Sequence, residues 1–354
     1  MRKKYLLALA LGTMLAAATI GCGKKEETNA PVTTEKVTTE APKEDPHKGM
    51  QKSNLTGEWI DEKVANKRPV AIMLNNIKAA IPQSNVSKAE ITYEILVEGG
   101  ITRMLLVMQD YEGLDKIGPV RSARHYYVDI ADEYNAIYMH FGQTKYAVAE
   151  IDKIGIDTLS GLSSIGNSVY YRDKKRKAPH NAYTSSEGIK KGIELSKYET
   201  LYSSSANQPH FQFQEEDTDL ASGNAANKIT LGYSTYTTPW FEYNTKTKEY
   251  LRFQYNDKHI DDQNNQQLSY KNVIIQFVKE WNIDKKGYQT MELVSSGKGY
   301  YCTNGKCIPI TWSKDSVSSP TKFFDETGDE IKVNPGKTFI SVFPRDRESK
   351  CVIN

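Results

Sequence analysis

The stretch Glu98–Arg124 constrains the fold more than any other part of this sequence. Its apolar run, Met104–Met108, has the composition of a buried strand, and charged residues and glycines flank it on both sides. Charges beside a buried strand, next to glycines that permit close approach of the backbone, are typical of a polar cleft and not of a solvated surface. We therefore expect a cleft built from Glu98, Arg103, Arg121 and Arg124.

The first 21 residues have the pattern of a lipoprotein signal peptide. Three basic residues (2–4) precede an apolar run, Tyr5–Ala18, that is too short to span a bilayer. Thr19-Ile20-Gly21-Cys22 follows as a lipobox, with threonine where leucine is usual. We expect cleavage before Cys22 and attachment of acyl chains such as palmitate to it; the alternative is an ordinary signal peptide with a chance cysteine. Two chains suffice for stable anchoring, so the predicted localisation is the outer face of the cell membrane.

Residues 22–54 predict a disordered tether. They are rich in Lys, Glu, Thr, Pro and Asn, and such a composition buries too little apolar surface to offset the entropy of ordering. Cleavage after residue 21 removes three positive charges, so the formal net charge falls from +2 to about −1. The basic isoelectric point of the whole chain is therefore no argument for a nucleic-acid partner.

The first folded domain is expected over residues 55–202. Short apolar runs predict buried strands at 69–74, 91–97, 103–108 and 136–141, and helical periodicity predicts helices near 123–134, 146–154 and 186–198. Ser122 is a suitable N-cap for the first of these helices. Helices mixed with short buried strands indicate an α/β or α+β domain.

Residues 203–227 are polar and predict a linker, after which the pattern changes. Turn signals such as Asn304-Gly305 and Asn334-Pro335-Gly336 divide residues 228–354 into short strands without a helix. We therefore predict an all-β domain at the C-terminus.

Two cysteines flank one of these turns. Cys302 and Cys307 become a cross-strand pair if Asn304-Gly305 forms a two-residue hairpin turn, and such a pair is close enough to bridge. A disulfide there suits an extracytoplasmic protein. Cys351 is expected to stay free.

Arg121-Ser122-Ala123-Arg124 stands at the expected start of a helix and forms the first candidate site. Free N–H groups at a helix N-terminus, with arginines beside them, favour an anion such as phosphate, pyrophosphate or carboxylate. The alternative is structural, with the arginines paired to Glu98 or Glu94 to fix the interior of the domain.

A basic loop supplies the second candidate. Arg172 opens a run of five basic residues in six positions, and Pro179-His180-Asn181 follows it. A histidine beside a rigid proline and an amide is a suitable general acid or donor to a ligand. If the loop folds over Arg121, one cleft holds arginine, histidine and glutamate together. The alternative for His180 is a structural hydrogen bond.

Other sequence patterns are weaker indications of a functional site. His140 ends a predicted strand, which favours a core histidine and leaves a place in the cleft open. His259 near Asp261 and Asp262 has the residue types of a metal site, but a polar turn there favours a plain loop. No G-x-S-x-G, P-loop, H-E-x-x-H or G-x-G-x-x-G motif is present. We expect neither a metal nor a cofactor.

Several motifs resemble those of the YerB family of Gram-positive lipoproteins. They are R-P-V-A-I-M-L-N-N (68–76), P-Q-S (82–84), Y-E-I-L-V-E-G-G-I-T-R (93–103), I-G-P-V-R-S-A-R (117–124), R-D…A-P-H-N-A-Y (172–183), N-V-I-I-Q (272–276), I-T-W-S-K (310–314) and N-P-G-K-T (334–338). The resemblance implies an extracytoplasmic lipoprotein with an N-terminal and a C-terminal domain of unknown function. It implies no activity, since none is established for the family.

We therefore expect an envelope protein that binds an anionic or glycan wall component, or another envelope protein. Its site would be ordered by Glu98 and would take positive charge and donors from Arg103, Arg121, Ser122, Arg124, Arg172, His180 and Asn181. A second interpretation is an enzyme acting on a phosphorylated or glycosidic wall polymer, with His180 or Glu98 as acid or base. A third is a scaffold that only presents surface.

Overall fold

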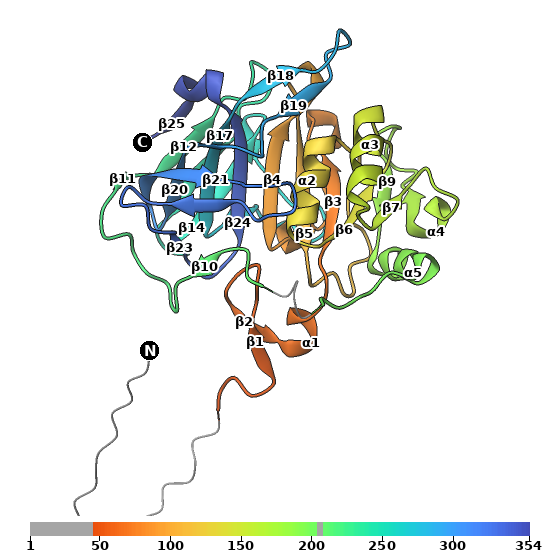
Figure 1. Cartoon of the computed structure of the whole chain (residues 1–354), viewed down its shortest axis with the longest axis horizontal. Helices are drawn as coiled ribbons and strands as arrows, with labels where there is room; N and C mark the ends of the chain where they lie inside the picture. Colours follow the sequence, from red (N-terminus) through yellow and green to blue (C-terminus); the bar gives the residue numbers. More distant parts are fainter. Residues whose placement is uncertain (1–44, 204–207) are drawn as a thin grey trace, which may run out of the picture. The chain divides into compact units, whose positions relative to one another are not determined.

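The computed structural model of the chain describes residues 45–203 and 208–354 (Figure 1). Residues 46–354 form one compact unit. The predicted signal peptide, Cys22 and the tether up to residue 44 lie outside the described residues. Within the two described ranges, no helix is both long enough and apolar enough to cross a membrane.

One sheet of eleven strands runs through both halves of the described chain. Its order is β11-β21-β20-β17-β24-β4-β5-β3-β6-β7, with β22 paired to β21. The N-terminal half contributes β3 (Val70–Asn75), β4 (Ile91–Leu96), β5 (Thr102–Met108), β6 (Ile137–His140) and β7 (Thr158–Ser160). The C-terminal half contributes β11 (Asn224–Ala225), β17 (Asn272–Val278), β20 (Ser296–Thr303), β21 (Lys306–Ser313), β22 (Lys322–Phe324) and β24 (Thr338–Pro344). The two halves meet where β24 and β4 pair in parallel, with Ile340 opposite Tyr93 (Figure 1).

The central strands are covered on both faces. Every residue of β3, β4, β5, β17 and β24 is buried. Strands covered on both faces are continuous apolar runs, which is the pattern that located three of them in the N-terminal half. The strands predicted at 69–74, 91–97 and 103–108 are confirmed, each to within one residue at either end.

Helices cover one face of the N-terminal half of this sheet (Figure 1). The hydroxyl of Tyr134, at the end of the first long helix, bonds the hydroxyl of Tyr93 on β4 at 2.7 Å. The α-helices are α1 (Glu62–Ala65), α2 (His125–Glu133), α3 (Lys145–Ile154), α4 (Gly166–Val169) and α5 (Ser186–Ser196). The 3-10 helices are η1 (Lys78–Ala80), η2 (Val86–Lys88), η3 (Glu98–Gly100) and η4 (Arg345–Lys350).

The prediction that Ser122 caps a helix is wrong. α2 begins at His125, and Arg124 is its N-cap without a side-chain cap hydrogen bond. The preceding backbone is held extended, because Arg121 N donates to the Met73 carbonyl and Ala123 N donates to the Gly142 carbonyl, both at 2.9 Å. These bonds delay the first helical turn.

A second sheet packs on the C-terminal half of the first. It consists of β12 (Lys228–Leu231), β13 (Trp240–Asn244), β14 (Glu249–Gln254), β15 (Asp257–Lys258), β16 (Ser269–Tyr270) and β25 (Cys351–Ile353). Aromatic rings fill the layer between the sheets: Phe241 lies 4.9 Å from Phe339, and Tyr233 lies 4.9 Å from Phe343. The predicted fold class is confirmed, with helices and strands mixed in the N-terminal half and strands almost throughout the C-terminal half.

Short strand pairs complete the described chain. They are β1 (Met50–Lys52) with β2 (Trp59–Asp61), β8 (Tyr170–Arg172) with β9 (Ala182–Thr184), β10 (Gln212–Phe213) with β23 (Lys332–Val333), and β18 (Glu280–Asn282) with β19 (Gln289–Met291). β1 falls in the range assigned to the tether, and β10 and β11 fall in the range assigned to the linker. Aromatic packing explains why these segments are folded and not extended: the His47 ring stacks on Trp59 at 4.0 Å, and Phe211 lies buried against Phe323.

The hairpin between β20 and β21 has the register that its turn predicts. Thr303 lies opposite Lys306, and Cys302 lies opposite Cys307. Asn304 and Gly305 take φ angles of 49° and 74°, the left-handed conformations of a type I′ turn. The structure joins the two cysteines, whose Cα atoms lie 4.1 Å apart, by a disulfide.

Candidate functional site

The candidate residues gather at the edge of the sheet where parallel strands end. β3 pairs in parallel with β6, and β6 pairs in parallel with β7, so their carboxyl ends lie together. In open α/β sheets this edge is where ligands bind. The segment 117–124 crosses the edge, with Val120 bridged to Leu74 and Ala123 bridged to Gln143. Both arginines of the segment are thereby placed at the edge.

Glu98 and Arg124 form the ordered centre of the site. Arg124 Nε donates to the two Glu98 oxygens at 2.8 and 3.0 Å, and its Nη2 donates to Oε2. Burial acts to raise the pKa of Glu98, but the hydrogen bond and charge of Arg124 outweigh it and hold this pKa below its ordinary value. Glu98 is therefore a bound carboxylate and not a proton donor at neutral pH.

Arg103 and Arg121 add positive charge, and within the described residues neither forms an ion pair with a carboxylate of its own; Glu98, which attracts Arg103, is paired with Arg124. Arg103 is 6% exposed and donates through Nη1 to the Ser122 carbonyl, so Ser122 positions it through its backbone. Arg121 reaches only the Pro179 carbonyl, at 3.5 Å. The Nε atoms of both arginines are buried and have no hydrogen-bond partner among the described residues. Burial and the charges of Arg124 and Arg121 lower the pKa of Arg103 to about 10.

The basic loop lies beside Arg121. Arg172 donates to the Asn181 amide oxygen at 2.9 Å, and its guanidinium stacks 4.2 Å from the ring centre of Phe141. The Asn75 amide nitrogen lies 2.6 Å from His180 Nδ1; since an amide nitrogen only donates, Nδ1 accepts and Nε2 carries the proton. Burial and the charges of Arg121 and Arg176 lower the pKa of His180, so its ring is neutral at pH 7.

Two residues of β6 add buried polar groups beneath the arginines. The Tyr138 hydroxyl forms no hydrogen bond of good geometry in the described chain. Burial raises its pKa, while the charges of Arg103 and Arg124 and a weak contact with the Arg124 backbone act to lower it. His140 is fully buried; Nδ1 donates to the Gly142 carbonyl at 2.9 Å, and burial lowers its pKa to about 4. His140 is among the residues that line a cavity of about 260 Å³, and its buried Nε2 has no partner among the described residues. Sequence reasoning missed Tyr138, although alternate residues of a strand share a face.

Glu94 is not part of this site. Its carboxylate pairs at 2.9 Å with Arg252 from the C-terminal half, and both side chains are 0% exposed. Asn76 and Thr102 donate to its other oxygen at 2.8 and 2.6 Å. Of the two structural pairings that the sequence left open for Arg121 and Arg124, only the one between Arg124 and Glu98 is formed.

The His259 region is a buried junction. His259 Nδ1 accepts from Arg252 at 3.1 Å, and Asp261 accepts from the backbone N–H groups of Asn85 and Ser87 at 2.9 and 2.8 Å. In residues 45–203 and 208–354 no three His, Cys, Asp or Glu side chains are grouped as metal ligands would be.

Comparisons with known proteins identify relatives over most of the chain, in sequence and in fold. Residues 55–199 match the family described as "Protein of unknown function (DUF3048) N-terminal domain", and residues 229–340 match its C-terminal domain. The sequence is 31% identical over 301 residues to "Putative lipoprotein YerB" of Bacillus subtilis (strain 168), which covers 83% of this chain and 86% of that protein. The fold is similar to the crystal structure of the YerB protein from Bacillus subtilis, with a TM-score of 0.76 and 29% identity over 86% of this chain and 99% of that chain.

Proposed function

Since the chain belongs to the DUF3048 family, whose two domains have no described function, we propose a function from its site: it is a lipid-anchored envelope protein that binds an anionic group of a wall polymer. The ligand group is a phosphate or a carboxylate, held by Arg103, Arg121 and Arg172 at the carboxyl edge of the sheet. Glu98 and Arg124 order the site and do not react.

The anchoring part of the proposal rests on the leader and on the relative. Cys22 follows a basic and then an apolar segment, and the relative from Bacillus subtilis is named a lipoprotein. Two acyl chains on Cys22 hold the protein at the outer face of the membrane. The disulfide between Cys302 and Cys307 suits the oxidising side of that membrane.

The unpartnered Nε atoms of Arg103 and Arg121 are the observation that carries the binding proposal. A buried donor without a partner costs about 1–3 kcal/mol, and a ligand oxygen around which either arginine side chain rearranges removes that cost. Arg124 and Arg103 act on the Glu98 carboxylate, and Arg121 and Arg172 lie close enough to repel these arginines or each other, so positive charge exceeds negative charge at the site. The first N–H groups of α2 add donors, because Arg124 provides no side-chain cap.

An enzyme acting on the same polymer is the second candidate. The observation that favours it is the tautomer of the neutral His180 ring, whose Nε2–H is available to donate a hydrogen bond to a substrate oxygen next to the arginines. Glu98 is a poor candidate acid because its pKa is lowered. Turnover that is lost in His180→Ala while binding is kept would establish the enzyme; binding without turnover supports the first proposal.

Retention on purified cell walls tests the binding proposal. The mature chain in nonionic detergent is compared with Arg121→Gln/Arg172→Gln on walls with and without their anionic polymers. We expect the polymer-dependent affinity to fall about tenfold or more in this variant and to fall with added salt. Lys174→Gln/Lys177→Gln removes the same charge from exposed positions of the same loop and should bind like the parent. Equal loss in the two variants, or retention without the polymer, contradicts the proposal.

A further inference from the structure

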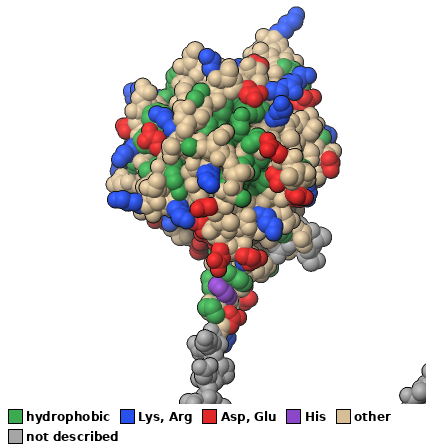
Figure 2. All heavy atoms as spheres, turned by 90° about the vertical axis from the view of Figure 1, so that its left-hand side faces the viewer, with side chains coloured by type: hydrophobic (Ala, Val, Ile, Leu, Met, Phe, Trp, Pro, Cys, Tyr) green, Lys and Arg blue, Asp and Glu red, His purple; other side chains and the backbone are tan. Residues whose placement is uncertain are grey.

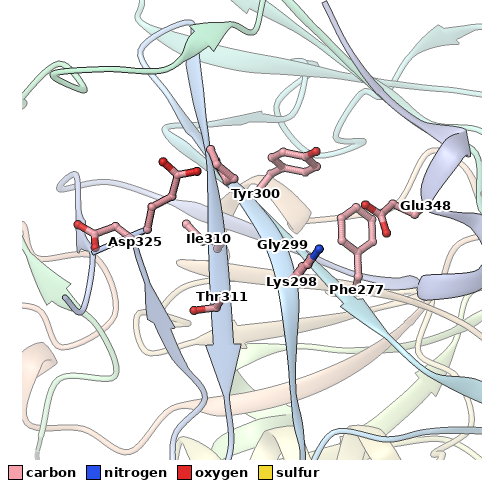
Figure 3. A pocket seen from close by; sticks show the side chains of 10 residues that line it. Phe277, Lys298, Gly299, Tyr300, Ile310, Thr311, Asp325 and Glu348 are labelled. Carbon is pink, nitrogen blue, oxygen red and sulfur yellow. The ribbon is translucent and has the colours of Figure 1, made fainter. Parts of the chain in front are cut away.

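A trough crosses the outer face of the β20–β21 hairpin, in the half of the chain that does not hold the arginine site. A cavity of about 340 Å³ is lined by these strands, by Phe277 of β17, by Asp325 and Glu326 after β22, and by Glu348 of η4 (Figure 3). A second cavity shares Tyr300 and Pro309 with it, and a third shares Pro309, Asp325 and Glu326. The shared residues make the three cavities parts of one depression.

The floor of this trough is apolar. Tyr300 lies directly opposite Pro309 in the antiparallel pair, so the two side chains share a face. The Phe277 ring meets the Tyr300 ring edge to face, 5.8 Å between centres. Figure 2 shows the side of the molecule on which β11, β20 and β25 lie in Figure 1, and hydrophobic side chains gather there between acidic and basic ones.

On one side the trough is bordered by a stretch of the outer edge of β21 that no strand of the described chain covers. β11 pairs with β21 at Lys306 and Cys307, and β22 pairs with it from Thr311 onward, so Pro309 lies between them. Counting from the turn, Thr303 and Lys306 form a hydrogen-bonded pair, and hydrogen-bonded and non-hydrogen-bonded pairs then alternate along the hairpin. Tyr300 and Pro309 are therefore a non-hydrogen-bonded pair, so the Pro309 carbonyl points away from β20 and into the gap between β11 and β22. Proline has no N–H, so this edge offers an acceptor without a donor and does not extend the sheet.

The rim of the trough is acidic. Glu326 and Glu348 line it, and neither side chain has an ion pair or hydrogen bond within the described parts of the chain. Asp325 faces its own turn and accepts from Thr327 N at 2.9 Å. Figure 3 shows Glu348 close to the Phe277 ring on one side of the strands and Asp325 on the other side. Lys298 is the single basic residue that lines the cavity, against three acidic ones, so the lining carries a net negative charge.

From this arrangement we propose that the trough binds a basic, extended peptide segment of a partner protein. Lysine and arginine carry a cation at the end of an apolar stem, which matches an acidic rim above an aromatic floor. The cations meet Glu326, Glu348 and the Pro309 carbonyl, and the stems lie on Tyr300 and Pro309. This site is separate from the arginine site and takes a ligand of opposite charge.

Calorimetry with blocked probe peptides tests the proposal. A peptide of alternating lysine and valine is titrated into the mature chain in nonionic detergent at low salt, beside a peptide of alternating glutamate and valine. We expect binding of the basic peptide alone. Glu326→Gln/Glu348→Gln should weaken it about tenfold, since two exposed ion pairs with the peptide are lost, and Tyr300→Leu should weaken it several-fold. Thermal unfolding of each variant checks that the fold is kept.

The matched control is Glu187→Gln/Glu194→Gln on helix α5. It makes the same change in net charge at exposed positions of the N-terminal half and should leave the affinity unchanged. Three results overturn the proposal: equal weakening in both double variants, equal binding of the acidic peptide, or no heat of binding with the basic peptide.

Discussion

Glu94 in β4 and Glu98 just after it each pair with an arginine, but the surroundings of the two pairs differ in burial and in charge. Glu94 meets Arg252 in full burial, and both of its oxygens are bonded. Glu98 meets Arg124 at the edge of the sheet, where Arg103 and Arg121 add charge without a partner carboxylate. The first pair joins the two halves of the molecule and balances its own charge, although Arg252 Nη1 has no partner among the described residues, whereas the second pair lies in a surplus of positive charge.

The difference shows how one pair of residue types serves two purposes. A buried pair balances its own charge, and removing one member leaves the other charge buried without a partner or solvent. A pair inside a surplus of one charge is held in place while its neighbours stay available to a ligand. Four sets of substitutions test whether the two regions differ in this way.

The largest effect is expected from Glu94→Gln. The substitution leaves the buried guanidinium of Arg252 without its counter-charge and should lower the free energy of unfolding by about 3–5 kcal/mol. Urea unfolding followed by circular dichroism measures it. Glu94→Gln/Arg252→Met removes both charges and should recover much of the loss. A single substitution as mild as an exposed one would show that this pair does not hold the halves together.

Glu98→Gln should cost less, about 1–2 kcal/mol, because Glu98 is half-buried and water partly replaces its carboxylate. The cost should also depend on pH. The folded pKa of Glu98 is lowered, so its contribution is fully present above the ordinary glutamate pKa of about 4.3 and is lost as pH falls through the folded pKa. Unfolding curves of parent and variant should therefore converge at low pH. Parallel curves across the whole acid range contradict this assignment.

Removing hydroxyl groups gives a smaller contrast. Tyr93→Phe takes away a hydroxyl that bonds Tyr134 at 2.7 Å and should cost about 1 kcal/mol. Tyr138→Phe removes a hydroxyl that forms no hydrogen bond of good geometry in the described chain, and its stability should stay equal or rise. Thermal unfolding of both variants measures the difference. A loss in Tyr138→Phe as large as that in Tyr93→Phe would mean that this hydroxyl is already satisfied.

Arg121→Gln should have the smallest effect and the opposite sign. Arg124 and Arg172 repel Arg121, so its removal should raise stability by about 0.5 kcal/mol at low salt, and the gain should shrink as salt screens the charges. Arg68→Gln is the matched control, because Arg68 pairs with Asp157 at 2.7 Å and should lose stability. A destabilised Arg121→Gln would make that arginine structural.

The sequence was informative where local pattern decides structure. β3 and β5 are continuous apolar runs, and Asn304-Gly305 sets its own hairpin register. The partner of Glu94 was beyond reach, because Arg252 comes from a distant segment and nothing in either neighbourhood specifies the pairing. The start of α2 was misplaced for a related reason: the backbone bonds to Met73 and Gly142 that hold residues 121–123 extended depend on strands far along the chain.

The residue types of the candidate site could be predicted from the sequence, but which arginine pairs with Glu98 could not. Arg121, Arg124, Arg172 and His180 were identified from the sequence, and the structure brings them to one edge. That Arg124 alone would engage Glu98, leaving the Nε atoms of Arg103 and Arg121 unpartnered, depends on side-chain geometry that no spacing encodes. Tyr138 was missed because a tyrosine in an apolar strand has the same pattern whether its hydroxyl is satisfied or not.

Because β4 pairs with β24, the central sheet cannot form completely until the C-terminal part of the chain has been synthesised. β4 is synthesised early and β24 near the end, yet each is the other's neighbour in the middle of the sheet. Until the C-terminal residues arrive, the N-terminal half carries an open strand edge of buried-type residues, a surface that promotes aggregation. Closing so long a loop is slow. A chain that stops before residue 338 thus lacks the strand that seals its centre, and we expect such truncated chains to be removed by proteases or to aggregate instead of persisting as a separate N-terminal domain.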